Sequence, residues 1–201
     1  MKDKPYFAVI YMFAVTAFFS SVLIGFARLT RDKVQANQKI AFEKAVLQVF
    51  PEITAKTNAR IHQVFTEQFE LSSGAYIYRK DGRIAGYAVP VEGQGFWSPI
   101  KGIIGLATDK QTVTGIAFYE QSETPGLGAR ITEPDFRASF KGLKLNEGEM
   151  PIDFRPAGTE LKESNEVHAI TGATQTCIRL ERLLNDSLIK WRQQLKQEDV
   201  H

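Results

Sequence analysis

One stretch of the sequence decides the fold: it reads Ala75-Tyr76-Ile77-Tyr78-Arg79-Lys80-Asp81-Gly82-Arg83-Ile84-Ala85-Gly86-Tyr87-Ala88-Val89. Aromatic and aliphatic residues favoured in strands fill both halves, and Asp81-Gly82 between them is a strong hairpin-turn signal. A second strand pair is indicated by residues 102–108 and 113–119, with Asp109-Lys110-Gln111 at the turn. The centre of the chain therefore predicts antiparallel hairpins.

Helical patterns follow this β-rich centre. Residues 134–140 favour a short helix, and residues 175–197 favour a long one. The long segment is amphipathic, because apolar residues recur along it at spacings of three and four: Cys177, Leu180, Leu184, Leu188 and Trp191. Hairpins followed by helices predict an α+β domain rather than a series of βαβ units.

The N-terminus carries a long apolar run. No charged residue occurs from Tyr6 to Ala27, which is long enough to cross a hydrocarbon core of about 30 Å as a helix. A cleaved signal peptide is the alternative, because Lys2 and Lys4 give a basic start. The run exceeds the usual apolar length of such peptides and has no clear small-x-small site before Arg28. A single transmembrane helix is therefore predicted.

These patterns divide the chain into three parts. Residues 1–29 are predicted to be the membrane anchor and residues 30–51 a connecting helix that ends at Phe50-Pro51. Residues 52–201 are predicted to form the folded domain. The positive residues on both sides of the apolar run do not decide which side of the membrane the domain faces.

Composition excludes several classes of function. The 201 residues carry a formal net charge of +2 and no basic stripe interleaved with aromatics, so no nucleic-acid partner is predicted. Cys177 is the single cysteine, which excludes an internal disulfide framework and a cysteine-built metal site. The histidines His62, His168 and His201 show no ligand spacing, and no metal site is expected.

The most informative stretch for chemistry is Ala169-Ile170-Thr171-Gly172-Ala173-Thr174-Gln175-Thr176. It reads as a strand end, a turn of small residues and a helix N-terminus. Unpaired N–H groups and the positive end of the helix dipole make such a terminus favourable for a phosphate, to which Thr174 would present its hydroxyl. The alternative is ordinary N-capping by threonine.

Two motifs resemble those of a known family. Thr171-Gly172-Ala173-Thr174 resembles the Ser/Thr-Gly-Ala-Ser/Thr flavinylation motif of FMN-binding domains, and Glu123-Thr124-Pro125-Gly126-Leu127-Gly128 matches the family's E-T-P-G-L-G loop at every position. Residues 95–102 are similar to the glycine-rich segment before that loop. The family includes the G subunit of Rnf-type electron transport complexes and the C subunit of Na+-translocating NADH:quinone reductases. The resemblance extends over essentially the whole chain.

The resemblance implies a cofactor and its site. In the family, a flavin transferase that uses FAD attaches FMN through a phosphoester bond to the last threonine of the motif, which is Thr174 here. The expected cofactor-binding residues are Thr174, Thr171, Gly172, Ala173, Thr176, Glu123, Thr124, Gly126, Leu127 and Gly128. The E-T-P-G-L-G loop is expected near the isoalloxazine, with backbone N–H groups on its oxygens, although a purely structural tight turn is the alternative. Phe96 or Trp97 either stacks on the ring or fills the core.

One position departs from the family pattern. An acidic residue usually stands six positions before the modified threonine, and this chain has His168 there. If that carboxylate assists the transferase, attachment of FMN here is slower or absent unless His168 or the nearby Glu166 replaces it. This departure supports an alternative of another class, a membrane-tethered assembly protein without flavin.

The resemblance leads to one functional expectation. The chain is expected to be the FMN-carrying electron-transfer subunit of an ion-translocating oxidoreductase, most similar to the Rnf G subunit, on the periplasmic side of the inner membrane. The flavin carries the electron chemistry, and no complete active site or catalytic residue is expected in this chain. Its partners are the lipid bilayer, the other membrane subunits and the flavin transferase. The alternatives are the quinone-reductase C subunit, a stand-alone flavin carrier and a secreted domain released by cleavage near Arg28.

Overall fold

The structure, a computed structural model, describes residues 5–198 and divides into two compact units between Lys39 and Ile40. Its elements in chain order are α1 (Pro5–Gln48), α2 (Asn58–Gln68), β1 (Phe69–Ser72), β2 (Ala75–Lys80), β3 (Arg83–Gln94), β4 (Pro99–Leu106), β5 (Val113–Glu120), the 3₁₀ helix η1 (Gly128–Thr132), α3 (Pro134–Ala138), β6 (Asp153–Arg155), β7 (Glu166–His168) and α4 (Thr174–Glu198).

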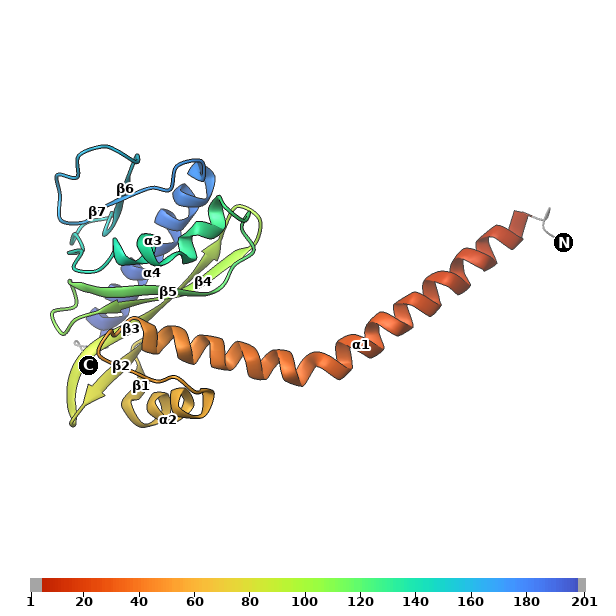
Figure 1. Ribbon diagram of the computed structural model, residues 1–201, viewed down its shortest axis with the longest axis horizontal. Coiled ribbons are helices and arrows are strands. Elements are labelled where there is room, and N and C mark those ends of the chain that lie inside the picture. The colour runs from red at the N-terminus through yellow and green to blue at the C-terminus, as the bar shows by residue number, and fades with distance from the viewer. Residues whose placement is uncertain (1–4, 199–201) are drawn as a thin grey trace. The chain divides into compact units, whose positions relative to one another are not determined.

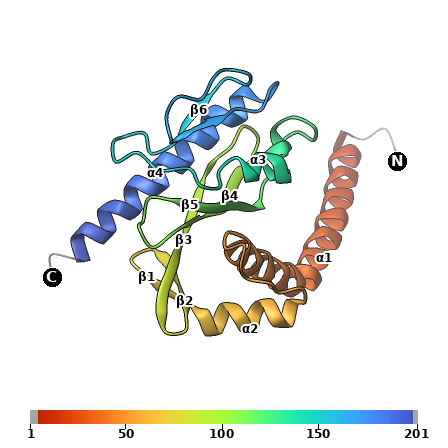
Figure 2. The ribbon, with the colours of Figure 1, turned by 60° about the vertical axis from the view of Figure 1, so that its left-hand side comes forward.

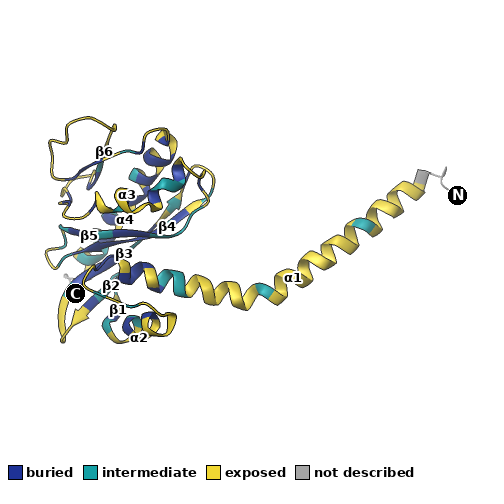
Figure 3. Ribbon diagram, viewed as in Figure 1, coloured by how far each residue is buried: buried dark blue, intermediate teal, exposed yellow. Residues whose placement is uncertain are grey.

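The N-terminal unit is helical wherever it is described. Residues 6–39 of α1 are exposed except for the half-buried Val15 and Thr30 (Figure 3). The helix contains a window of mean hydropathy 2.2 and is long and apolar enough to cross a membrane. An apolar helix near the N-terminus passes the same test when it is a signal sequence. The predicted boundaries at residues 29 and 51 stay predictions.

The second unit is built on a five-stranded antiparallel sheet in the order β1-β2-β3-β4-β5 (Figures 1 and 2). The hairpin predicted from residues 75–89 is confirmed, since Lys80 pairs with Arg83 across the turn. Asp81 and Gly82 have φ values of 52° and 77°, the left-handed conformations that a tight two-residue hairpin turn requires. The second predicted hairpin corresponds to β4 and β5.

Each face of this sheet is covered by helices. On one face α4 buries all five apolar residues that its pattern predicted, Cys177, Leu180, Leu184, Leu188 and Trp191. On the other face a second core contains Val46 from the end of α1, Val49 just after it and Val64 from α2 (Figure 2). The α+β class is confirmed, with the sheet as the middle layer.

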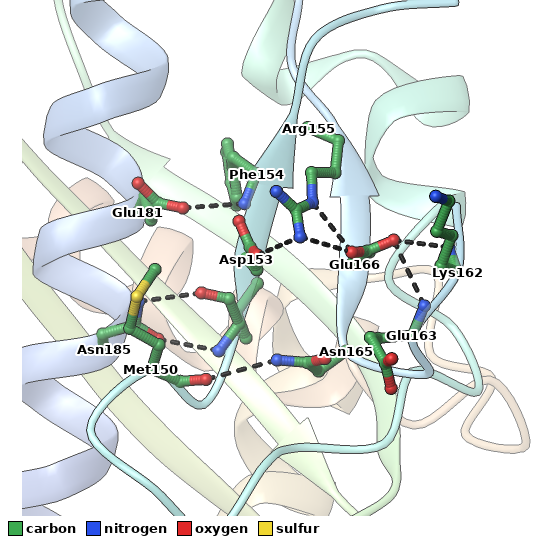
Figure 4. Close-up of polar contacts among 11 residues, drawn as sticks. Met150, Asp153, Phe154, Arg155, Lys162, Glu163, Asn165, Glu166, Glu181 and Asn185 are labelled. Carbon is green, nitrogen blue, oxygen red and sulfur yellow. Dashed lines mark hydrogen bonds and ion pairs between the residues drawn. The ribbon is translucent and has the colours of Figure 1, made fainter. Parts of the chain in front are cut away.

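A small parallel sheet of β6 and β7 lies beside the first half of α4. The buried Asn185 of α4 accepts a hydrogen bond from the backbone N–H of Ile152 and donates one to its carbonyl, both at 2.8 Å. Glu181 accepts a third bond from the N–H of Phe154 at 2.7 Å (Figure 4). The segment from residue 150 to residue 168, named the β6–β7 lobe, is thus fixed to α4 by side chains.

Several elements have no clear signal in the sequence. The helix α2 has only Ile61 and Val64 buried, and β1, β6 and β7 are too short to show an alternation of polar and apolar residues. The glycine-rich segment forms the end of a hairpin, because β3 continues to Gln94 and β4 begins at Pro99.

Candidate functional site

The buried carboxylate of Glu123 joins three segments that are far apart in sequence. Its Oε1 accepts a hydrogen bond from the backbone N–H of Trp97 at 3.1 Å, and its Oε2 accepts one from Thr176 Oγ1 at 2.7 Å. The glycine-rich hairpin, the E-T-P-G-L-G loop and the first turn of α4 therefore meet at one side chain. We call this meeting point the Glu123 junction.

Two glycines make the Glu123 junction possible. A Cβ atom at Gly95 would lie 2.6 Å from Glu123 Oε1, and one at Gly128 would lie 2.5 Å from Thr176 Oγ1. Both distances are shorter than real Cβ contacts, so any larger residue would push the segments apart. Close packing of protein groups therefore accounts for these two glycines of the motifs.

The E-T-P-G-L-G loop is a tight turn stabilised by its own backbone. The N–H groups of Leu127 and Ala129 both donate to the carbonyl of Thr124 at 3.1 Å. Gly126 has φ of +75°, a conformation that glycine adopts without strain. The Leu127 amide therefore already has a hydrogen-bond partner within the loop.

Thr174 is the first residue of α4 and is exposed. The turn before it bends at Gly172, with φ of +83°, and closes with a bond from the N–H of Ala173 to the carbonyl of Ile170. A Cβ atom at Gly172 would lie 3.2 Å from Leu127 Cδ2, so the two motifs also touch here. Thr174 thus stands at a helix N-terminus and open to solvent, as a site of modification requires.

A cleft of about 410 Å³ lies between the β6–β7 lobe and the start of α4. Thr171, Gly172 and Thr174 contribute to its rim, and apolar side chains dominate the rest of its lining, namely Phe154, Pro156, Ala157, Ala169, Ile170, Cys177 and Ile178. A cleft of this size, mostly apolar and with a few polar groups, is typical of cofactor sites. The residues present fit FMN, because an apolar space for a ring adjoins a hydroxyl at a helix N-terminus.

Two ionisable side chains line the same cleft, Cys177 and Glu181. Burial raises the pKa of the Cys177 thiol, whose sulfur accepts a bond from the N–H of Ile170 at 3.3 Å. Burial also raises the pKa of the Glu181 carboxyl, more than the hydrogen bond from Phe154 lowers it. The cleft therefore favours the neutral form of both groups.

The β6–β7 lobe contains its own buried carboxylate, Glu166. Its Oε2 accepts bonds from the N–H groups of Lys162 and Glu163, and its Oε1 lies 2.7 Å from Arg155 Nη2 (Figure 4). The bond from the Lys162 amide is the largest cause of the lowered pKa of Glu166. Glu166 is thus occupied in holding the loop between β6 and β7.

His168 is exposed at the end of β7, and its Nε2 lies 2.8 Å from the carbonyl of Thr159. The departure from the family pattern therefore lies on the surface of the lobe, six residues before Thr174. This position is accessible to an enzyme that would act on the threonine.

The ten residues predicted to bind the cofactor fall into two main groups. Thr171, Gly172 and Thr174 line the cleft, whereas Glu123, Gly128 and Thr176 form the junction beside it. The remaining four are the buried Ala173 of the turn and three exposed residues of the E-T-P-G-L-G loop, Thr124, Gly126 and Leu127. No group of three or more potential metal ligands occurs among residues 5–198.

Two aromatic residues of the glycine-rich hairpin stand at the surface. Phe96 is 43% exposed and Trp97 is 66% exposed, so the expectation that either fills the core is wrong. Trp97 Nε1 donates to the hydroxyl of Thr124, which is itself exposed, at 3.0 Å. The guanidinium of Arg179 on α4 lies 5.9 Å from the centre of the Phe96 ring. The hairpin is therefore held by the backbone of Trp97 at the junction, and its two rings face outward.

Comparison with known proteins agrees with this geometry. The FMN-binding domain family matches residues 95–189, a range that contains the Glu123 junction, the cleft and Thr174. Among curated relatives, the C subunit of the Na(+)-translocating NADH-quinone reductase of Chlamydia caviae is 29% identical over 196 residues, which cover 84% of this chain and 61% of that protein. The C subunit of the same enzyme in Vibrio anguillarum is 38% identical over 103 residues, which cover 50% of this chain and 40% of that protein.

Solved structures show the same fold. The C subunit of the Na(+)-translocating NADH-quinone reductase from Parabacteroides distasonis has a TM-score of 0.67 at 22% identity, covering 84% of this chain and 96% of that one. Shewanella oneidensis NqrC has a TM-score of 0.68 at 17% identity, covering 81% and 99%. The matches span 61% and 40% of the lengths of the Chlamydia caviae and Vibrio anguillarum C subunits. The names of these relatives favour the quinone-reductase C subunit, which was the alternative expectation, over the Rnf G subunit that was expected first.

Proposed function

We propose that the chain, whose residues 95–189 match the FMN-binding domain family, carries FMN through a phosphoester bond to Thr174. One observation carries the proposal: Thr174 is exposed at the first position of α4 and lines an apolar cleft of about 410 Å³. A residue that only capped the helix would need no such cleft beside it.

The residues around Thr174 have distinct roles in this proposal. The N–H groups of the first turn of α4 and the helix dipole stabilise the phosphate, and Gly172 lets the backbone turn sharply before it. The flavin, when bound, supplies one- and two-electron transfer. The apolar walls of the cleft, such as Pro156 and Ile178, exclude water from the ring.

The Glu123 junction holds this site in shape. The E-T-P-G-L-G loop is fixed against the first turn of α4 by Glu123, Gly128 and Thr176. These residues act on the cofactor only by positioning Thr174. Leu127 packs beside Gly172 and is exposed, so it is placed to contact the cofactor from the side of the loop.

We further propose that the chain is an electron-transfer subunit similar to the C subunit of a Na+-translocating NADH:quinone reductase. The names of its relatives and the apolar helix α1 support a place among membrane subunits. In this proposal residues 1–29 anchor the chain in the inner membrane, residues 30–51 connect the anchor to the domain, and the domain faces the periplasm. An FAD-dependent flavin transferase attaches the FMN.

A second function has one specific observation in its favour. His168 replaces the acidic residue expected six positions before Thr174, and the carboxylate at the start of β7, Glu166, is occupied by Arg155 and two backbone amides. A chain that the transferase does not modify would serve as a flavin-free, membrane-tethered assembly protein. The presence or absence of covalent FMN separates these two functions.

The test is the mass of the chain produced together with a flavin transferase. We expect one added FMN phosphoester, mapped to the peptide that contains Thr174. Thr174→Ala removes the attachment completely while the circular dichroism spectrum stays unchanged, because an exposed residue at a helix start contributes only about 1 kcal/mol. Thr174→Ser keeps the hydroxyl and is expected to keep the FMN.

Two results would decide against the proposal. Covalent FMN on Thr174→Ala would place the attachment elsewhere. An unmodified wild-type chain, in a host that modifies another member of the family, would favour the flavin-free function. In that case His168→Asp tests whether the missing carboxylate is the reason.

A further inference from the structure

The cleft beside Thr174 holds a carboxyl group that the proposed attachment of FMN does not use. Glu181 stands on α4 two turns after Thr174, and its side chain lines the same cleft. It is half-buried, and its Oε1 accepts the backbone N–H of Phe154 at 2.7 Å. This bond fixes the carboxyl at the boundary between α4 and β6 (Figure 4).

The charged groups that face Glu181 come from β6 and from its own helix. Asp153 and Arg155 of β6 act in opposite directions, since Asp153 raises the pKa of Glu181 and Arg155 lowers it. Arg155 is itself paired with Asp153 at 3.0 Å and with Glu166 at 2.7 Å. On α4 the neighbour is the Cys177 thiol, which burial keeps protonated. The cation that acts on Glu181 is thus shared with two other carboxylates, and desolvation has the largest influence on its charge.

We propose that Glu181 tunes the reduction of the FMN held in this cleft: its ionised carboxylate opposes the arrival of electrons, and its protonated form does not. The proposal rests on the proposed attachment of FMN to Thr174. Electrons added to the ring place negative charge in the cleft, and like charges in a partly dry space repel each other more strongly than in water. The electrons come from a reduced partner subunit of the proposed complex, or from dithionite in the test below, and the Glu181 carboxylate then binds one proton from water.

The sign of the pH dependence follows from this linkage. Glu181 loses its proton at a higher pH when the ring is reduced than when it is oxidised. Between these two values reduction takes up an extra proton, so the midpoint potential falls more steeply with pH. Since burial raises the pKa of Glu181 before any charge is added to the cleft, this window begins above the ordinary value of 4.5.

The experiment compares the wild-type chain carrying FMN with Glu181→Gln. Glutamine keeps an oxygen that accepts the Phe154 N–H but has no charge. Midpoint potentials are measured by spectrophotometric redox titration with dithionite from pH 5 to pH 9. We expect the two proteins to have equal midpoint potentials at the acidic end and Glu181→Gln to have the higher one at the alkaline end. The segment in which the potential falls more steeply with pH should be present in the wild-type chain and absent from the variant.

Asp186→Asn is the matched control, because Asp186 is an exposed carboxylate on the same helix that does not line this cleft. It should follow the wild-type curve. Intact mass is measured first on every sample. Absence of FMN from the wild-type chain would overturn both this inference and the proposed function. If FMN is on Thr174 and the midpoint potentials of wild type and Glu181→Gln coincide at every pH, this inference alone is overturned. It is also overturned if Asp186→Asn raises the midpoint potential as much as Glu181→Gln does.

Discussion

Two buried carboxylates organise the two sides of the Thr174 turn, and they do so differently. Glu123 bonds one backbone amide and one hydroxyl, and thereby joins segments that are 26 and 53 residues away in sequence. Glu166 bonds amides only three and four residues away and an arginine on the neighbouring strand. The first carboxylate therefore connects distant parts of the domain, whereas the second holds one loop of the β6–β7 lobe.

This difference bears on how each side can respond to a bound group. The Glu123 junction is tightly packed, since a Cβ atom at Gly95 or Gly128 would collide with it. The lobe has an exposed loop from residue 156 to residue 164, where a Cβ atom at Gly158 would meet nothing within 4 Å. We infer that the junction fixes the start of α4, where Thr174 lies, and that the exposed loop of residues 156–164 is the part of the lobe least constrained by packing.

The largest expected effect separates the two carboxylates directly. Glu123→Ala leaves the Trp97 amide and the buried Thr176 hydroxyl without their partner, and we expect it to lower the free energy of unfolding by about 2–4 kcal/mol. Glu166→Ala is expected to raise amide exchange mainly within residues 156–168. Urea unfolding and hydrogen exchange measured by mass spectrometry give the two quantities.

The contrast between the two carboxylates is wrong if Glu123→Ala and Glu166→Ala change stability and amide exchange in the same way. Faster exchange throughout the five-stranded sheet in Glu166→Ala would mean that lobe and sheet unfold as one unit. If Glu123→Ala speeds amide exchange only within residues 95–98, the junction holds only the tip of the hairpin.

The two sides also differ in how well the sequence predicts them. The hairpin around Asp81-Gly82 and the apolar face of α4 follow from local turn chemistry and helical spacing, and both are confirmed. The lobe has no such signal, because β6 and β7 have three residues each and because parallel pairing of Asp153–Arg155 with Glu166–His168 leaves no periodic pattern.

The candidate site is predictable as a set of motifs but not as a geometry. The motifs single out Glu123 and Thr174, yet nothing in the sequence indicates that the Glu123 carboxylate bonds Thr176 rather than a cofactor. Helical spacing places Glu181 on the polar face of α4, and its position in the cleft depends on the unpredicted strand β6. Long-range contacts of this kind are set by tertiary packing, which local propensity does not describe.

A smaller effect is expected from the glycines on the two sides. Gly128→Ala forces a Cβ atom to within 3.0 Å of Thr176 and Glu123, and such overpacking should cost about 1–3 kcal/mol. Gly158→Ala meets no atom, and only its φ of +85° opposes the substitution, which should cost about 1 kcal/mol. Urea unfolding of both variants measures the difference. Equal decreases in the free energy of unfolding would show that the junction relaxes around an added methyl group and does not hold its segments in fixed positions.

The smallest effect is expected at the exposed edge of the same junction. Trp97→Phe keeps an aromatic ring but removes the bond from Nε1 to Thr124 Oγ1, which lies where water can replace either partner. Trp97 is 66% exposed, and its backbone N–H still donates to Glu123 in the variant. We therefore expect the free energy of unfolding, measured in urea, to fall by less than about 1 kcal/mol. A loss as large as that of Gly128→Ala would mean that the indole ring, and not the buried carboxylate, fixes the hairpin against the loop. The position of Thr174 would then depend on a surface contact that a partner protein or a bound ring can displace.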